Sequence, residues 1–553
     1  MTVPRVLVSD PLAEEGMSLL RQACGVEVFC SADFPEQDLS EVLQECDGVI
    51  IRSGTHLTAD VLEPQRRLQV IVRAGVGVDN IAVPIATRRG IIVMNTPAGN
   101  TTSTAEHTIA LLLALSRNVA PACESLLAGK WERHRFTGIQ LAGKILGIVG
   151  LGRVGLAVAR RALGLDMKII GYDPYLSSET AEKQGVHVAN DLQEVLSQCD
   201  FLTVHTPLTS DTRALIGEEE IAQMRSGVRI LNCARGGIVD EQALYQGLKQ
   251  GHIGGAALDV FQEEPPNRIP LMELSNVLVT PHLAASTAEA QASVAVEAAQ
   301  LIVDYLTTGA VRYAVNTVPI DQTELRGLRL YLNMAWRLGL FHAQYDEGGI
   351  RRVCISYRGE IAMKETRWIT AAFTAGLLQT ALSESVNFVN AELLARERGI
   401  EIIEQTSQEG GDFTSLMHTE VLTDVSEYVA SGTLFGQQFL RLVQLGPFHL
   451  DTYLDGKLLL FTHRDIPGLV GFIGTIFGKH QVNIAQMTVG RQRTEPGGDA
   501  LAVLNLDSEP SEDALIEVAA HPDIRKVSVV KLPDSGIYPP WLIADREEIR
   551  TPS

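Results

Sequence analysis

Short apolar runs alternate with longer amphipathic stretches along the first 100 residues. The segments that alternate in this way are RVLVSD, DGVIIRSGT, LQVIVRAGVGVDN and GIIVMNTP, and each ends in polar residues or glycine. Continuous apolar strands separated by helical segments indicate a parallel sheet that is covered on both faces. Loops at the carboxyl ends of such strands are the usual place for a ligand.

A second series of the same kind follows residue 100. The stretch NTTSTAEHTIALLLALSRNV predicts a helix with several Ser/Thr cap candidates, an acid in its first turn and a long apolar face. The strand-like runs after it are KILGIVGLGRVG, KIIGYDP, DFLTVHTPL, VRILNCARGG, GGAALDVF and NVLVTPHLAAS. An alanine-rich helix over residues 286–306 closes the series.

The pattern changes near Pro319, where we expect the chain to leave this α/β body. Residues 320–452 mix helical and strand signals around no recognisable chemical motif, whereas the pattern from about residue 453 predicts βαββαβ, a small independent module. Residues 533–553 show no periodicity and are interpreted as a tail. The predicted fold class is α/β: two doubly wound Rossmann-like parallel-sheet domains, an α+β domain and the βαββαβ domain.

Composition restricts the partners of the protein. The 553 residues carry a formal net charge of −21, which disfavours nucleic acid and anionic membranes as partners. Seven scattered cysteines form no CxxC pair, the first residues form no signal sequence, and no apolar run reaches the roughly 20 residues that cross a bilayer. We therefore expect a cytoplasmic protein without a metal site, in which local arginines attract any anionic ligand.

The segment KILGIVGLGRVG contains the pattern Gly150-x-Gly152-x-x-Gly155 between an apolar run and a helix. Such glycines allow a tight turn, close approach of a pyrophosphate and close packing of helix on strand, and the helix N-terminus attracts the phosphates. Asp173 ends the next strand, where a carboxylate accepts from the ribose hydroxyls and repels a 2′-phosphate. The pattern predicts NAD rather than NADP; the alternative is a turn without a ligand.

Three polar residues follow apolar strands of the second series, namely Arg235, Glu264 and His282. In a doubly wound sheet these strand ends face one crevice. Each residue alone has a plain explanation: an arginine paired with Asp240 or Glu241, a surface glutamate and a histidine at the core edge. Their joint occurrence downstream of the glycine loop favours an active site.

These motifs also carry a resemblance. GLGRVG, NCARGGIVDE, GGAALDVFQEEPP and VTPHLAAST, in this order, resemble the D-isomer-specific 2-hydroxyacid dehydrogenases. The segment THRDIPGLVGFIGTIFGKHQVNIAQM resembles an ACT regulatory domain, and the whole resembles the long-form members of the family that oxidise D-3-phosphoglycerate to 3-phosphohydroxypyruvate with NAD in serine biosynthesis. The implied domains are 1–99 with 285–316 for substrate, 100–284 for NAD, 317–452 intervening, 453–532 ACT and 533–553 tail.

The resemblance also implies residue roles. Arg235, Glu264 and His282 would be catalytic, with Glu264 rather than Glu263 matching the family position before the Pro pair. The implied NAD contacts are Val76, Gly150, Gly152, Arg153, Val154, Gly155, Asp173, Thr206, Cys233 and Asp259. The implied substrate contacts are Arg52, Ser53, Gly54 and Asn100, and the implied regulatory residues are His463, Asp465 and Asn483.

The residue types suit the implied chemistry. A neutral histidine can take the hydroxyl proton, and a glutamate can orient that histidine. An arginine can bind the substrate carboxylate. The two glycines after Arg235 are expected to admit substrate and nicotinamide. A substrate phosphate needs further cations, for which Arg52 and Arg73 are candidates. Arg133 and Arg135 could reach a neighbouring subunit's site or simply belong to a solvated loop.

The sequence leaves the effector, the oligomeric state and two alternative functions open. L-Serine is a candidate effector of the ACT-like module; Asp465 stands where some members carry Asn, and the module could instead only dimerise. We expect a homo-oligomer, either a dimer or a homotetramer. The alternative functions are a glyoxylate or hydroxypyruvate reductase, whose chains lack the two C-terminal domains, and a non-enzymatic NAD(H)-sensing binding protein.

Overall fold

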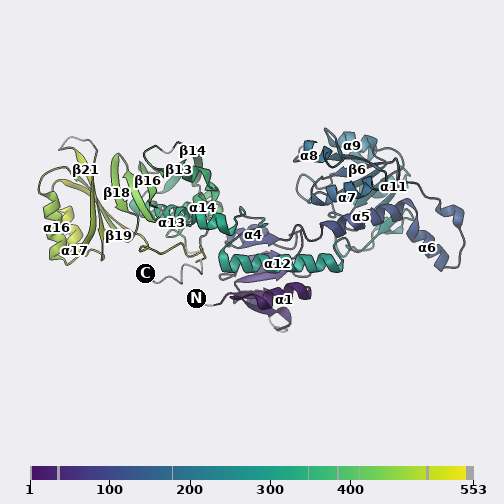
Figure 1. Cartoon of the computed structure of the whole chain (residues 1–553), viewed down its shortest axis with the longest axis horizontal. Helices are drawn as coiled ribbons and strands as arrows, with labels where there is room; N and C mark the ends of the chain where they lie inside the picture. The colour runs from purple at the N-terminus through teal and green to yellow at the C-terminus, as the bar shows by residue number, and fades with distance from the viewer. Residues whose placement is uncertain are drawn as a thin grey trace.

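Four β-sheets lie one after another along an elongated molecule (Figure 1). The computed structural model describes residues 3–33, 38–176, 178–346, 348–382, 385–409, 411–436, 438–492 and 497–543. In Figure 1 the first sheet lies at the centre, the second to the right, and the third and fourth to the left.

The first sheet has five parallel strands in the order β2-β1-β3-β4-β5. Its strands are β1 (Arg5–Val8), β2 (Glu27–Cys30), β3 (Gly48–Ile51), β4 (Val70–Arg73) and β5 (Ile92–Asn95), with helices α1 (Glu14–Gln22), α2 (Leu39–Leu43), α3 (Ala59–Leu62) and α4 (Val83–Arg88). The long helix α12 (Ala288–Thr308) packs against α1, β3 and β4, so a segment distant in sequence covers one face of this sheet.

The second sheet has seven parallel strands in the order β12-β11-β10-β9-β6-β7-β8. Its strands are β6 (Ile145–Val149), β7 (Lys168–Tyr172), β8 (His187–Val188), β9 (Phe201–Val204), β10 (Val228–Asn232), β11 (Ile253–Leu258) and β12 (Val277–Val279). Its helices are α5 (Thr101–Ser116), α6 (Val119–Leu127), α7 (Arg153–Leu163), α8 (Ser178–Glu182), α9 (Leu192–Gln198), α10 (Glu218–Gln223) and α11 (Glu241–Lys249). The strand order reverses between β6 and β9, and such a switch point opens a ligand crevice.

The chain crosses between these two sheets twice, before α5 and before α12. A hydrogen bond of 2.7 Å between the hydroxyls of Ser103 and Thr287 joins the two crossings. The predicted Ser/Thr cap of α5 is wrong, because the N-cap residue is Asn100 and its side chain makes no capping bond. The first turn of α5 also contains no acid, since Glu106 lies further along the helix.

The third sheet is mixed, as expected for an α+β region. Its strands are β13 (Ile350–Gly359), β14 (Glu401–Ser407), β15 (Ser415–Thr423), β16 (Glu427–Phe435), β17 (Phe439–Leu445) and β18 (Phe448–Tyr453), in the order β14-β13-β15-β16-β17-β18. Helices α13 (Gln322–Tyr345) and α14 (Thr366–Leu378) pack on each other, and α15 (Ala391–Glu397) follows. Most of α13 is buried, so it forms the centre of this part of the molecule.

The predicted βαββαβ order is confirmed in the fourth sheet. The elements are β19 (Lys457–Arg464), α16 (Leu469–Lys479), β20 (Ile484–Arg491), β21 (Asp499–Leu506), α17 (Glu512–Ala519) and β22 (Ile524–Lys531). The strands pair antiparallel in the order β20-β21-β19-β22. Each of the four proposed domains therefore contains one sheet; their exact limits stay a proposal.

The last described residues, 533–543, return to α13. The guanidinium of Arg337 donates to the backbone carbonyls of Pro533, Asp534 and Ile537, and Leu542 is buried. Among the described residues, no single helix is long and apolar enough to cross a membrane; α5 and α6 meet the length and composition criteria only as a pair bent by 62°.

Candidate active site

A cavity of about 500 Å³ lies between the first and second sheets. Two of the predicted residues reach it from the first part of the chain, Val76 after β4 and Asn100 at the first crossing. The predicted residues that line it from the second part are Gly152, Arg153, Val154, Thr206, Cys233, Arg235 and His282. The cavity thus lies at the carboxyl ends of the strands, where ligands bind in sheets of this type.

His282 and Glu264 form a direct contact at the edge of this cavity. The Nδ1 atom of His282 lies 2.6 Å from Oε2 of Glu264, while Glu263 accepts a hydrogen bond from Asn267 instead. Burial alone would raise the pKa of Glu264. The hydrogen bonds from His282 and from the backbone N–H of Phe261 lower it by a larger amount, so the pKa lies below its ordinary value. The carboxylate is therefore ionised at neutral pH, and Nε2 of His282 remains for a ligand.

Arg235 follows β10 and reaches toward the first sheet. Its Nε donates to Oδ2 of Asp79 at 3.1 Å and its Nη1 donates to the carbonyl of Ala234 at 2.7 Å. Asp240 caps α11 by accepting from the Ala243 N–H, and Glu241 accepts from the Gln262 N–H. The acids that follow Arg235 in sequence thus bind other groups.

Gly236, the first of the two glycines after Arg235, was expected to admit substrate and nicotinamide, but the structure requires a glycine there for packing. A Cβ at Gly236 would stand 1.8 Å from the carbonyl oxygen of Phe261. Gly236 therefore permits the loops after β10 and β11 to pack against each other.

The glycine loop between β6 and α7 has the shape expected for a dinucleotide. A Cβ at Gly155 would lie 2.0 Å from the carbonyl oxygen of Gly150, so this position admits only glycine. A Cβ at Gly152 would meet nothing within 4 Å, which leaves the N-terminus of α7 open to a ligand. The buried hydroxyl of Thr206 also faces this cavity without a hydrogen-bond partner among the described residues, so the residues present fit NAD.

Asp173 and Asp259 lie outside the cavity lining. Asp173, after β7, accepts the backbone N–H groups of Leu151 and Tyr175, so it stands beside the glycine loop. Asp259, after β11, is fully buried and binds the segment around His282. Their contacts with NAD stay predictions.

A group of arginines extends the site into the first sheet. Burial, together with the neighbouring charges of Arg235 and Arg52, lowers the pKa of Arg73 to about 10. Two further guanidinium groups thus act on Arg73, an arrangement that favours binding of an anion. The predicted residues Arg52, Ser53 and Gly54 do not line the cavity; the Arg52 carbonyl accepts from Asn80, the neighbour of Asp79, and the Arg52 N–H donates to the carboxylate of Asp10.

Sequence reasoning missed several cavity residues, including Asp79, Asn95, His205 and Val315. His205 follows β9 directly, so its position at a strand end was a usable signal; burial lowers its pKa to about 4 and keeps it neutral. Val315 comes from the segment after α12, which no local pattern connects with the cavity.

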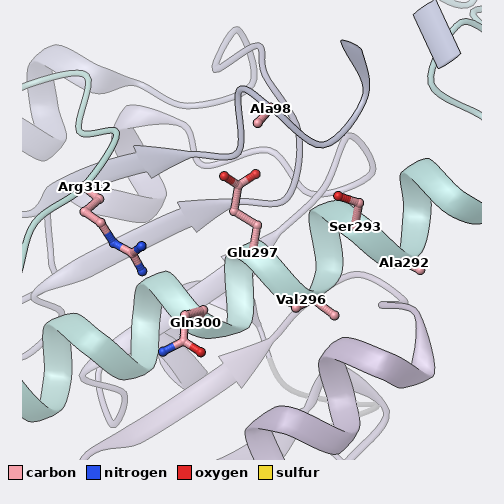
Figure 2. Close-up of a pocket in the computed structure, with 7 residues that line it drawn as sticks. All are labelled: Ala98, Ala292, Ser293, Val296, Glu297, Gln300 and Arg312. Carbon is pink, nitrogen blue, oxygen red and sulfur yellow. The ribbon is translucent and has the colours of Figure 1, made fainter. Parts of the chain in front are cut away.

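A second hollow, of about 550 Å³, lies along α12 (Figure 2). Figure 2 shows Glu297 pointing from α12 toward Ala98, with Arg312 nearby. None of the residues predicted for substrate or cofactor lines it, whereas Pro97 and Asn100, on either side of Ala98 in sequence, line the candidate active site. The hollow is separate from the candidate active site.

The remaining predicted residues lie elsewhere. Arg133 and Arg135 are exposed in a 3₁₀ turn after α6, and Arg135 pairs with Glu132. No group of three or more His, Cys, Asp or Glu side chains that could hold a metal ion occurs in the described part of the chain.

Of the predicted regulatory residues, His463 lies near the end of β19, whereas Asp465 follows that strand and Asn483 precedes β20. His463 is buried, its Nδ1 lies 2.7 Å from the Arg464 carbonyl, and its Nε2 has no hydrogen-bond partner among the described residues. Asp465 forms an ion pair with Arg491, while Asn483 donates to Asp507. The structure therefore gives Asp465 and Asn483 separate partners.

Comparison with known proteins adds two family matches. Residues 109–284 match the D-isomer specific 2-hydroxyacid dehydrogenase NAD binding domain, and residues 327–446 match the D-3-phosphoglycerate dehydrogenase intervening domain. The D-3-phosphoglycerate dehydrogenase of Methanocaldococcus jannaschii is 40% identical over 528 residues, which is 96% of this chain and 100% of that protein. That of Bacillus subtilis is 38% identical over 529 residues, again 96% of this chain and all of the relative.

Two solved structures each resemble a little more than half of the chain. A glyoxylate reductase from Paecilomyes thermophila has a TM-score of 0.52 and 27% identity, and covers 57% of this chain and 99% of its own. An NAD-dependent formate dehydrogenase from Staphylococcus aureus in complex with NAD has a TM-score of 0.52 and 25% identity, and covers 57% of this chain and 100% of its own.

Proposed function

The chain belongs to the D-3-phosphoglycerate dehydrogenase family, and we propose that Arg235, Glu264 and His282 are its catalytic residues. It is an NAD-dependent oxidoreductase that oxidises D-3-phosphoglycerate to 3-phosphohydroxypyruvate in L-serine biosynthesis. The observation that carries the residue assignment is the 2.6 Å contact between His282 and Glu264 at a cavity that also contains Arg235 and the glycine loop.

His282 is the general acid/base of the proposed mechanism. Its Nδ1 is held by Glu264, so Nε2 accepts the proton of the substrate hydroxyl while the hydride on C2 departs. NAD, when bound, supplies the nicotinamide that accepts this hydride. The carboxylate of Glu264 then stabilises the resulting imidazolium, as the aspartate does for the histidine in a Ser-His-Asp triad.

Arg235 binds the substrate carboxylate and polarises the 2-oxygen in this mechanism. Its guanidinium is always charged and planar, which suits two parallel hydrogen bonds to a carboxylate. Asp79 and the Ala234 carbonyl hold the group in one orientation before substrate arrives. The substrate would displace part of this contact, because Asp79 also lines the cavity.

The phosphate of the substrate requires the remaining cations. Arg73 is partly buried, and Arg235 and Arg52 both lie close enough to lower its pKa. A phosphate dianion placed among these groups would relieve their mutual repulsion. Arg133 and Arg135 lie in the turn after α6 and outside the lining of this chain's cavity, so we propose that they contribute, if at all, to the site of a neighbouring subunit in the proposed homo-oligomer.

The fourth sheet is proposed to be an ACT domain that binds L-serine as a feedback inhibitor through His463, Asp465 and Asn483. The buried, unpartnered Nε2 of His463 in the described structure supports a polar ligand there. Initial rates measured with and without millimolar serine test the proposal, which fails if serine leaves the rate unchanged.

The formation of NADH, followed by absorbance, tests the proposed site. The wild-type enzyme should turn over D-3-phosphoglycerate and show little turnover with D-lactate or D-glycerate. Arg73→Met should lower the preference for the phosphorylated substrate over D-glycerate. A preference that the variant leaves unchanged would refute the assignment of the phosphate to this arginine group.

A further inference from the structure

His282 adopts a backbone conformation that needs support from its surroundings. Its φ is +52°, in the left-handed region, where a non-glycine residue is strained and persists only when its surroundings hold it. The N–H of His282 donates to the carbonyl of Asp259 at 2.8 Å and to that of Thr280 at 3.0 Å. The orientation of the imidazole therefore depends on what holds Asp259.

The Asp259 side chain gathers the rest of this loop. Its Oδ1 accepts the Leu283 N–H at 2.8 Å and its Oδ2 accepts the Ala284 N–H at 2.9 Å. The hydroxyl of Thr280 donates to Oδ1 at 2.6 Å. Burial raises the pKa of Asp259, but these hydrogen bonds and that of His107 lower it to about 2, so the buried carboxylate is ionised.

His107 completes the network from a different element. It lies on α5, 152 residues from Asp259 in sequence, and its Nε2 is 3.2 Å from Oδ1 of Asp259 and 3.2 Å from the hydroxyl of Thr280. The His107 side chain is outside the cavity lining, so any effect on the reaction passes through other residues. A buried carboxylate that loses one donor is left undercompensated and moves toward another partner.

We propose that His107 is a positioning residue, which fixes the Asp259 carboxylate and thereby holds His282 in its left-handed conformation at the hydride-transfer site. The inference rests on the proposed catalytic role of His282. Helix α5 would then do more than pack against the second sheet. It follows the first crossing between the sheets, and its His107 would support the loop around His282, which precedes the second crossing.

Two substitutions at position 107 separate hydrogen bonding from volume. His107→Leu removes the donor, and we expect kcat to fall by about 10- to 100-fold. His107→Gln places an amide N–H where Nε2 stands and should restore most of kcat. The solvent deuterium isotope effect on kcat should rise in His107→Leu, because a displaced His282 makes proton transfer slower.

Thr280→Val provides a second variant that removes a donor from the same Asp259 oxygen. Because both donors act on one carboxylate, its loss of kcat should not add fully to that of His107→Leu. Glu106→Gln is the matched control: Glu106 lies beside His107 on α5 but is exposed and pairs with Arg161, so kcat should stay at the wild-type value.

The same assays distinguish the catalytic role of His282 from the positioning role of His107. His282→Gln should be almost inactive, and an active His282→Gln enzyme would overturn the proposed catalytic role itself. If His282→Gln is inactive while folded His107→Leu and Thr280→Val keep the wild-type kcat and isotope effect, the positioning inference alone is wrong. A fall in kcat that His107→Gln does not repair would also contradict it.

Discussion

At the residue scale, the geometry of Arg235 makes a sharp prediction about charge and shape. Arg235→Lys keeps the positive charge but loses the planar fork that Asp79 and the Ala234 carbonyl orient. Losing one charged hydrogen bond in the transition state costs about 1.5–3 kcal/mol, so kcat/KM should fall by about 10- to 100-fold. Steady-state kinetics with D-3-phosphoglycerate measure this loss.

Arg229→Lys is the control for that experiment. Arg229 lies on β10, the same strand that leads to Arg235, but its guanidinium stands over the Phe201 ring and not in the cavity. The control should keep the wild-type kcat/KM. Similar kinetics for Arg235→Lys and the wild type would remove Arg235 from the carboxylate-binding role.

Sequence motifs identified the residues that follow strands, but not the residues that hold them. Arg235, Glu264 and His282 follow apolar strands of one parallel sheet, so topology alone predicted a shared crevice. Asp79 and His107 reach their partners across 156 and 152 residues of sequence. No local pattern carries such pairings, because they arise only when separate elements are packed together.

At the scale of the element, α13 contains a pH-sensitive residue. His342 is fully buried, and burial lowers its pKa to about 3, while its two nitrogens lie 3.2 Å and 2.7 Å from the hydroxyls of Tyr428 and Thr419. The unfolded chain takes up a proton at this histidine near pH 6.5. The stability due to neutral His342 is therefore complete above about pH 6.5 and is lost as the pH falls toward 3.

His342→Gln should weaken this acid sensitivity. Its amide keeps hydrogen-bonding capacity but does not titrate, so the loss of unfolding free energy between pH 6 and pH 4 should shrink by about 1.4 kcal/mol per pH unit. Urea titrations followed by the fluorescence of Trp336 and Trp368, which are buried in this part of the molecule, measure the slope. Parallel pH profiles for the two proteins would contradict the prediction.

Elements buried on both faces were the most predictable. The runs that became β1, β3 and β4 are continuous and apolar, and these strands are largely buried. Strand β2 lies at the edge of its sheet, with an exposed Glu27 and only partly buried neighbours, so its pattern is weak. The cap of α5 was predicted wrongly: the residue before the helix is Asn100, which lines the active-site cavity and makes no capping hydrogen bond.

At the scale of the whole molecule, residues 533–543 connect the fourth sheet with helix α13, although the sequence pattern placed these two parts in separate domains. All five N–H groups of the buried Arg337 are used: Nε donates to Asn333, Nη1 to the carbonyls of Leu454 and Pro533, and Nη2 to those of Asp534 and Ile537. The indole of Trp541 packs against Phe388, whose ring stacks on that of Trp368. Residues 533–543 thus connect the end of the fourth sheet to helices α13 and α14, which together are called the α13 region below.

Removing this segment tests how far it stabilises that region. A chain ending at Leu532 lacks three of the carbonyls that satisfy Arg337, so we expect the unfolding free energy of the α13 region to fall by about 3–5 kcal/mol. Urea titration followed by far-UV circular dichroism, together with the rate of limited proteolysis, measures the loss. A chain ending at Ile543 keeps every contact named above and is the matched control. Equal stability of the two truncated chains would show that the Arg337 contacts contribute little, whereas a loss confined to the shorter chain would place the stabilisation in residues 533–543.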